Sequence, residues 1–127
     1  MSWVRTVGLC SLLPLLLTGC DGTTTFCFVS TLGASPQSAI VVVGSSQKFV
    51  ASGTTTLACT FQSDPATSVV WSVSDPVNVS ISNSPGASFG TATCLGATGG
   101  PVAVTATLGA EKNGGKQVAA TSTLTCE

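Results

Sequence analysis

Residues 69–74 read VVWSVS, and this stretch decides the fold class. Valine or tryptophan at positions 69, 71 and 73 alternates with valine or serine at positions 70, 72 and 74. A period of two is typical of a β-strand with one buried face. The pair Asp75-Pro76 then favours a turn. We therefore expect a central strand that places Trp71 in the hydrophobic core, not on a ligand platform.

The same alternation recurs in short segments separated by turn residues. Seven or eight short strands at this spacing predict an all-β sandwich. No segment after the leader has apolar residues spaced by three and four with charged partners, which predicts essentially no helix there. Besides 69–74, we expect strands at residues 39–43, 47–52, 57–62, 77–82, 88–95, 102–108 and 116–126.

Three segments carry more specific expectations. Residues 39–43 read AIVVV, a continuous apolar run that predicts a strand covered on both faces. Residues 109–115 combine charges with glycine, which predicts an exposed hairpin loop. In the last strand we expect Val118, Ala120 and Leu124 to face inward.

The first nineteen residues have the layout of a signal peptide. Arg5 is their only charge, and residues 7–17 form a mostly apolar run. That run is far shorter than the roughly 20 residues that a transmembrane helix needs. A buried core helix is the alternative, but no polar face accompanies the run. We therefore expect the protein to be exported.

The end of this run, LTGC at residues 17–20, resembles a bacterial lipoprotein signal. The resemblance implies cleavage before Cys20 and a diacylglyceryl group on its sulfur, with palmitate as an acyl chain. Two acyl chains hold a protein on a membrane, whereas one gives only marginal binding. Asp21 resembles a signal for retention in the inner membrane. We expect a protein anchored to a bacterial membrane, with Asp21 favouring the inner one and the outer one left open.

Removal of residues 1–19 leaves enough chain for one small domain. We divide the chain into a signal peptide at 1–19, a lipid-anchored linker at 20–34 and one domain at 35–127. So few charges form neither a basic patch for nucleic acid nor a polybasic strip for anionic lipids. The charged residues after the leader are Lys48, Lys112, Lys116, Asp21, Asp64, Asp75, Glu111 and Glu127.

Four cysteines remain once Cys10 leaves with the leader and Cys20 is acylated. An even number of cysteines in a small exported domain predicts two disulfides. Zinc is the alternative, but no two of the four are close in sequence and the chain has no histidine. We therefore expect no metal and no other cofactor. The four are Cys27, Cys59, Cys94 and Cys126.

Several short stretches carry a family resemblance through their order along the chain. They are SP at 35–36, VGS at 43–45, VWSVS at 70–74, VSI at 79–81, GTAT at 90–93 and VAVTAT at 102–107. Around the Trp-Ser pair this order resembles the group 2 bacterial immunoglobulin-like domains, which are repeated in intimin- and invasin-type surface proteins. The likeness covers about residues 35–125 and implies an immunoglobulin-like β-sandwich of about seven strands. Four cysteines depart from the cysteine-poor pattern of that family.

In such a sandwich the two chain ends lie at opposite poles. Cys27 and Cys59 then belong near one pole, and Cys94 and Cys126 near the other. This placement favours the pairs Cys27–Cys59 and Cys94–Cys126. The nested pattern, Cys27–Cys126 with Cys59–Cys94, stays open, because an extended segment 27–35 could run along the sandwich.

These residues give little support for catalysis, and we expect that the protein is not an enzyme. Asp64 and Asp75 each precede proline, which indicates turn formation and not acid–base work. Residues 97–100, ATGG, lack the lysine and the following helix of a phosphate loop. No Asp-x-Asp cluster offers calcium its several oxygens. Asn78 fits an outward polar position on its strand.

We expect a membrane-anchored, exported, non-catalytic lipoprotein that acts as a binding or structural module of the cell envelope. The alternative is an accessory component of a secretion or surface-polymer assembly. The expected partners are the membrane, through Cys20, and an envelope protein or a polysaccharide, with no nucleic acid.

Overall fold

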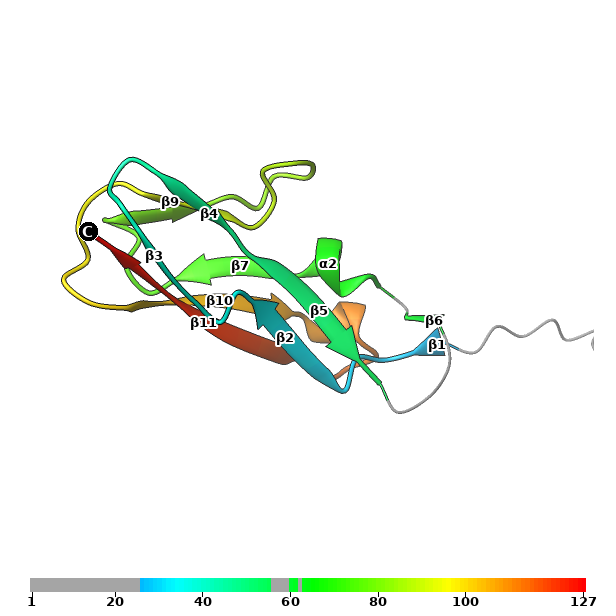
Figure 1. Cartoon of the computed structure of the whole chain (residues 1–127). Coiled ribbons are helices and arrows are strands. Elements are labelled where there is room, and N and C mark those ends of the chain that lie inside the picture. Colours follow the sequence, from blue (N-terminus) through cyan, green and yellow to red (C-terminus); the bar gives the residue numbers. More distant parts are fainter. Residues whose placement is uncertain (1–25, 56–59, 62) are drawn as a thin grey trace, which may run out of the picture.

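The computed structural model describes residues 26–55, 60–61 and 63–127, which are built mostly of β-strands. The strands form two facing layers, with the C-terminus at one end of the molecule and β1 and β6 at the other (Figure 1). The all-β, sandwich-like architecture is confirmed. The elements are β1 (Phe26–Cys27), β2 (Thr31–Ser35), β3 (Ser38–Val41), β4 (Ser46–Lys48), β5 (Val50–Thr54), β6 (Thr60–Phe61), α2 (Pro65–Ser68), β7 (Val70–Val73), β8 (Val79–Ile81), β9 (Thr91–Cys94), β10 (Val102–Leu108), η3 (Ala110–Lys112) and β11 (Val118–Cys126).

The first layer is the four-stranded sheet β3-β11-β10-β7. β10 pairs antiparallel with both β11 and β7, while β3 joins β11 in parallel. The alternation along β10 places Val104, Ala106 and Leu108 in the core, which is the inward face expected for residues 102–108. On β11 the even-numbered positions face inward and include the buried Ser122 beside Leu124.

The second layer contains the sheet β4-β9-β8 and the pair β2-β5. The strand expected at 47–52 is divided at Phe49, because β4 pairs with β9 whereas β5 pairs with β2. At the division the backbone N–H of Phe49 donates to the carbonyl of Gly90 at 2.8 Å. Phe49 and Ala51 are both buried, on the inward side that their alternation predicts.

The core lies between the two layers and contains a pair of aromatic rings packed against each other. Trp71 is only 2% exposed, and its ring centroid lies 6.3 Å from that of Phe49, with the ring planes inclined at 46°. Replacing a buried aromatic residue by alanine typically costs about 3–5 kcal/mol. Trp71 on the first layer and Phe49 on the second therefore hold the layers together.

The expectation that residues 39–43 are covered on both faces is wrong. β3 is an edge strand with only β11 beside it in the sheet. Ile40 is 70% exposed and Val42 is 62% exposed, while Ala39 and Val41 pack against the core. A continuous apolar run is consistent with a strand between two layers, but here one set of side chains faces solvent.

The compact part of the chain also begins before the expected boundary at residue 35. β2 pairs with β5 over five residues, and Val29 and Leu32 belong to the core. Val29 lies two residues after the buried Cys27, with the exposed Phe28 between them. The part of the predicted linker from residue 26 onward is therefore structural. The sequence of β2 does not show a clear alternation of apolar and polar residues, because glycine and serine occupy exposed positions of this strand.

Two short helical turns depart from the expectation of essentially no helix after the leader. α2 begins after Asp64, whose side chain accepts a hydrogen bond from the backbone N–H of Ala66 at 3.0 Å, with Pro65 at the first helical position. η3 lies within residues 109–115, which were expected to form an exposed loop. That loop is exposed at residues 111, 112, 114 and 115 and partly buried at residues 109 and 110, whereas Asn113 is only 2% exposed.

Three of the four cysteines lie in the described part of the chain: Cys27 is in β1 at one end of the molecule, and Cys94 and Cys126 are the last residues of β9 and β11 at the other end (Figure 1). Cys94 and Cys126 are bonded to each other, with their Cα atoms 5.7 Å apart. Cys27 is also in a disulfide. The nested pattern, with Cys27–Cys126 and Cys59–Cys94, is therefore wrong. Cys59 lies outside the described residues, so the Cys27–Cys59 pair stays a prediction.

Candidate functional site: an apolar groove beside β5

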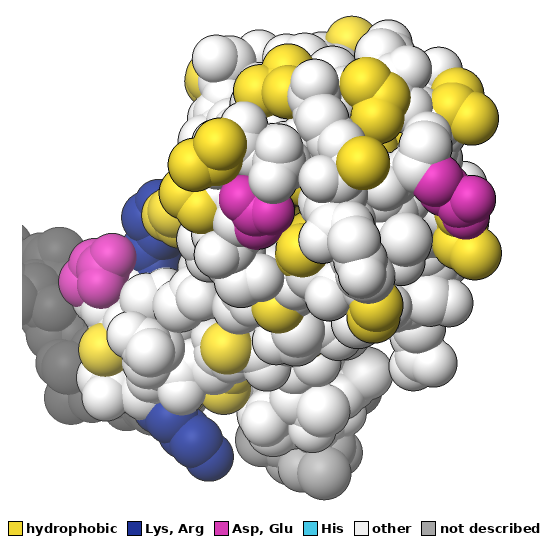
Figure 2. All heavy atoms as spheres, turned by 90° about the vertical axis from the view of Figure 1, so that its left-hand side faces the viewer, with side chains coloured by type: hydrophobic (Ala, Val, Ile, Leu, Met, Phe, Trp, Pro, Cys, Tyr) yellow, Lys and Arg dark blue, Asp and Glu magenta, His cyan; other side chains and the backbone are white. Residues whose placement is uncertain are grey.

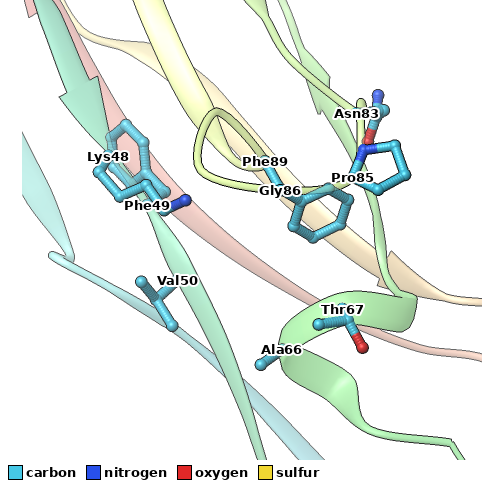
Figure 3. Close-up of a pocket in the computed structure, with 9 residues that line it drawn as sticks. All are labelled: Lys48, Phe49, Val50, Ala66, Thr67, Asn83, Pro85, Gly86 and Phe89. Carbon is cyan, nitrogen blue, oxygen red and sulfur yellow. The ribbon is translucent and has the colours of Figure 1, made fainter.

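A groove of about 410 Å³ opens between the β4–β5 segment, α2 and the loop that joins β8 to β9. Figure 3 shows Lys48 and Val50 on one side, Phe89 and Pro85 on the other, and Ala66 and Thr67 of α2 below. We call this site the β5 groove. Its lining is Lys48, Phe49, Val50, Ala66, Thr67, Asn83, Pro85, Gly86 and Phe89.

The wall of the β5 groove formed by residues 82–90 is tied to β7 by one side chain. The Oδ1 atom of Asn83 accepts from the backbone N–H of Trp71 at 2.7 Å, and its Nδ2 donates to the Trp71 carbonyl at 3.0 Å. The asparagine amide thus occupies the place of a neighbouring strand on the free edge of β7. This loop is held by the same backbone that carries the central tryptophan.

Gly90 closes the same loop at a position that tolerates no side chain. Its φ of +78° is in the left-handed region, which favours glycine. A Cβ atom there would collide with the carbonyl oxygen of Phe49 and would lie 3.1 Å from Nε1 of Trp71. Close packing of loop against core therefore sets the position of Phe89 in the groove wall.

The chemistry of the β5 groove is apolar with a few polar groups at its border. Lys48 is the only charged residue of the lining, and its Nζ donates to the carbonyl of Ala87 at 2.9 Å. Thr67 contributes a hydroxyl, and the amide of Asn83 is already engaged with Trp71. Pockets of this kind bind apolar groups and use few polar contacts to orient them. No pair of titratable side chains faces the groove among these lining residues.

A second apolar surface lies at the end that carries the C-terminus. Figure 2 shows hydrophobic side chains spread over this end, with carboxylates among them. Backbone hydrogen bonds link its loops, from Gly44 to Cys94, from Val43 to Glu127 and from Leu95 to Asn78. Val42, Val43, Val77 and Leu95 are all exposed there. The strand expected at residues 77–82 begins only at Val79, and Val77 lies in the turn before it.

Asp64 and Asp75 both organise the local backbone. Asp64 caps α2. The side-chain amide of Asn78 donates to Asp75 at 2.9 Å and its backbone N–H donates at 3.2 Å, and these bonds hold the pKa of Asp75 below its ordinary value. Asn78 is therefore a turn residue and not simply an outward strand position. Its carbonyl also accepts from the backbone N–H groups of Leu95 and Gly96.

The site residues predicted from the sequence thus lie in different parts of the molecule. Trp71 is in the core behind the β5 groove and does not line it. Cys27 is at the end opposite the Cys94–Cys126 bond. The predicted acylation site at Cys20 lies outside the described residues. Sequence reasoning missed Asn83 and Phe89, and the available signal was the turn sequence NSPG at 83–86, which precedes the phenylalanine.

Searches with family models and against curated proteins find no match to this chain. Within the described part of the chain, no helix combines the length and the apolar character needed to cross a bilayer.

Proposed function

We propose that the chain is an exported lipoprotein, anchored through Cys20, that presents one immunoglobulin-like domain as a non-catalytic binding or structural module of the cell envelope. The observation that carries the fold assignment is strand order. The first layer, β3-β11-β10-β7, corresponds to strands A′, G, F and C of an immunoglobulin-like sandwich. The second layer, β8-β9-β4 with β5-β2, supports the same assignment, since it follows the order D, E, B and A when β4 and β5 together take the place of strand B.

The disposition of the two ends supports an anchored module. β1 lies at the end opposite the C-terminus (Figure 1). Five residues, 21–25, connect Cys20 to β1, and such a segment spans at most about 18 Å when extended. An anchor at Cys20 would keep the β1 end near the lipid and direct the apolar C-terminal end away from it, toward other envelope components.

A non-catalytic role agrees with the structural roles of the two aspartates. Asp64 and Asp75 are committed to a helix cap and a turn. The β5 groove offers apolar contact with one ammonium group at its border, which suits an apolar segment of a partner protein. We propose the groove as the binding site of the module.

Anchoring is tested by Cys20→Ser in the full-length chain, with Cys10→Ser as the matched control inside the leader. The proposal expects Cys20→Ser to lose incorporation of labelled palmitate and to leave the membrane fraction, while Cys10→Ser behaves like the parent. If Cys20→Ser fractionates with the membrane and still incorporates palmitate, anchoring through this residue is wrong.

Partner binding is tested by crosslinking in intact envelopes followed by affinity purification and mass spectrometry. Ala66→Arg places a long charged side chain in the β5 groove, and Ala119→Arg makes the same change at an exposed position of β11 outside the groove and outside the apolar C-terminal end. A partner that binds in the groove is lost with Ala66→Arg and kept with Ala119→Arg. Equal recovery with both variants would exclude the groove. A fixed stoichiometry with secretion or surface-polymer components would favour the accessory role.

A further inference from the structure

The segment after β1 is held in place by an asparagine that precedes a glycine. The asparagines of the chain are Asn78, Asn83 and Asn113, and of these only Asn113 has glycine next to it. Its side-chain amide accepts from the backbone N–H of Val29 at 2.7 Å and donates to the Val29 carbonyl at 3.0 Å. We call these two bonds the Val29 latch.

The structure requires both residues of the Asn-Gly pair. At position 113 one buried side chain has to accept from an N–H group and donate to two carbonyls, those of Val29 and Lys116. At position 114 the φ angle is +64°, and a Cβ atom there would collide with the ring of Phe28. The fold therefore places a side-chain amide directly before a residue that has no side chain.

An asparagine followed by glycine is the pair in which the main chain most easily attacks the side chain. The backbone nitrogen of the glycine, after losing its proton to base in the solvent, forms a bond to Cγ of the asparagine. The Cγ–Nδ2 bond breaks, and the nitrogen takes up a proton and leaves as ammonia. Water then opens the five-membered succinimide at either carbonyl, which gives aspartate or isoaspartate. Glycine favours the attack because its nitrogen is unhindered and its backbone turns freely.

The closed Val29 latch restrains both reacting groups. Turning the Asn113 amide toward the nitrogen of Gly114 would break its bonds to Val29 and Lys116. The ring of Phe28 also lies against Gly114. Phe28 and Val29 are neighbours in the chain, so departure of their segment frees the amide and the attacking nitrogen together. The reaction therefore depends on opening of this segment.

We infer that Asn113-Gly114 is a deamidation site that makes opening of the Val29 latch irreversible. The product has a carboxylate oxygen where Nδ2 donated to the carbonyls of Val29 and Lys116, so oxygen faces oxygen and the latch does not close again. Isoaspartate also adds a methylene group to the main chain of the β10–β11 connection. A chain that has reacted keeps its sandwich, which Cys94–Cys126 closes at the other end, but its segment before β2 stays released.

The first test follows deamidation of the purified full-length protein at mildly alkaline pH by peptide mass mapping. Asn83 is the internal control, because it makes the same two bonds to Trp71 but precedes serine. In urea without reductant, Asn113 should react several-fold faster than Asn83. In native buffer Asn113 should react at least about tenfold more slowly than in urea, because the open state is a minor population. No reaction at Asn113 in urea, or equal rates in buffer and urea, overturns the inference.

The second test separates local opening from unfolding of the whole domain. Val29→Ala weakens the packing of the latch segment and keeps its backbone, while Val79→Ala makes the same change at a buried position of β8. We expect Val29→Ala to speed deamidation of Asn113 in native buffer by about 5- to 30-fold. Val79→Ala should change it little. Equal acceleration by both variants would show that the reaction follows global unfolding, and the latch would be wrong.

The third test examines the product. Asn113→Asp carries the carboxylate, and Asn83→Asp introduces the same group at the other backbone clamp. Hydrogen exchange of the Val29 amide should lose its protection in Asn113→Asp and keep it in Asn83→Asp, while the amides of β10 stay protected in both. Protection of Val29 in Asn113→Asp would contradict release of the segment. If that variant does not fold, the parent protein and the two valine variants still decide the inference. None of these measurements depends on anchoring or on partner binding.

Discussion

Asn113 holds Val29 from a position 84 residues further along the chain. Its Oδ1 atom accepts from the backbone N–H of Val29 at 2.7 Å, and its Nδ2 atom donates to the Val29 carbonyl at 3.0 Å. The same Nδ2 donates to the carbonyl of Lys116 at 2.8 Å. A buried side chain in the β10–β11 connection thereby fastens the segment between β1 and β2 to the sandwich. Asn83 makes the same two bonds to Trp71 at the other side of the fold.

Asn113→Ala should destabilise the domain markedly. The change leaves buried backbone groups of Val29 without their partner, and each buried group left unsatisfied costs about 1–3 kcal/mol. We expect the free energy of unfolding in urea to fall by at least about 2 kcal/mol. Gln117→Ala, at an exposed position of the same connection, is the control and should change little. Equal effects of both changes would contradict the role of Asn113.

Asn83→Ala should loosen the wall of the β5 groove more than it destabilises the whole domain. Asn83 is exposed, so water can replace part of its bonding, and we expect a loss of about 1 kcal/mol. Hydrogen exchange of the Trp71 amide should become faster, because its acceptor is removed. Ser84→Ala in the same turn is the control. Unchanged exchange at Trp71 would show that the amide bond is not formed in solution.

Gly90→Ala should cost more than Gly99→Ala, although both glycines have φ in the left-handed region, +78° and +72°. An alanine there costs about 1–2 kcal/mol in either case. At Gly90 the methyl group also meets Phe49 and Trp71, whereas no atom lies within 4 Å at Gly99. We expect an additional loss of about 1–3 kcal/mol for Gly90→Ala from overpacking. Thermal unfolding of both variants measures the difference, and equal losses would rule out the contact.

Replacing Cys94 and Cys126 together by alanine should destabilise the domain by about 3–4 kcal/mol, because the bond closes a segment with a sequence separation of 32. The loss arises mainly from the greater freedom of the unfolded chain. Urea unfolding of the double variant, compared with the parent under non-reducing conditions, measures it. A loss below about 1 kcal/mol would indicate that the unfolded chain is already restricted in this region.

The hydrogen bonds of Asn78 to Asp75 predict a pH dependence at acid pH. Since they lower the pKa of Asp75 in the folded protein, its contribution to stability is fully present above the unfolded pKa of about 3.9. The contribution disappears as the pH falls through the folded pKa, where the carboxylate is protonated. We expect Asp75→Asn to flatten this part of the stability profile between about pH 2 and pH 5. Thermal unfolding across that range is the measurement, and an unchanged profile would contradict it.

Local periodicity predicted much of the fold. The alternation in residues 69–74 and 102–108 correctly indicated strands with one buried face, including the position of Trp71. The spacing of turn residues indicated a layered all-β chain. These features depend on neighbouring residues along one strand, so the sequence carries them directly.

The positions of the groove and of the open edge could not be predicted in this way. Residues 39–43 have the same apolar run whether a second layer or solvent covers their outer face. The change of partner at Phe49 and the loop anchored by Asn83 depend on hydrogen bonds to residues distant in sequence. A period of two does not specify them.

The sequence by itself determined the all-β class and the inward residues of the central strands. Tertiary structure alone decided which strands lie at an edge, where the β5 groove opens and which backbone groups Asn83 and Asn113 occupy. The physical reason is that alternation reports the burial of a strand face. The hydrogen-bonding edges of a strand are perpendicular to that direction, and only the packing of distant segments settles what lies beside them.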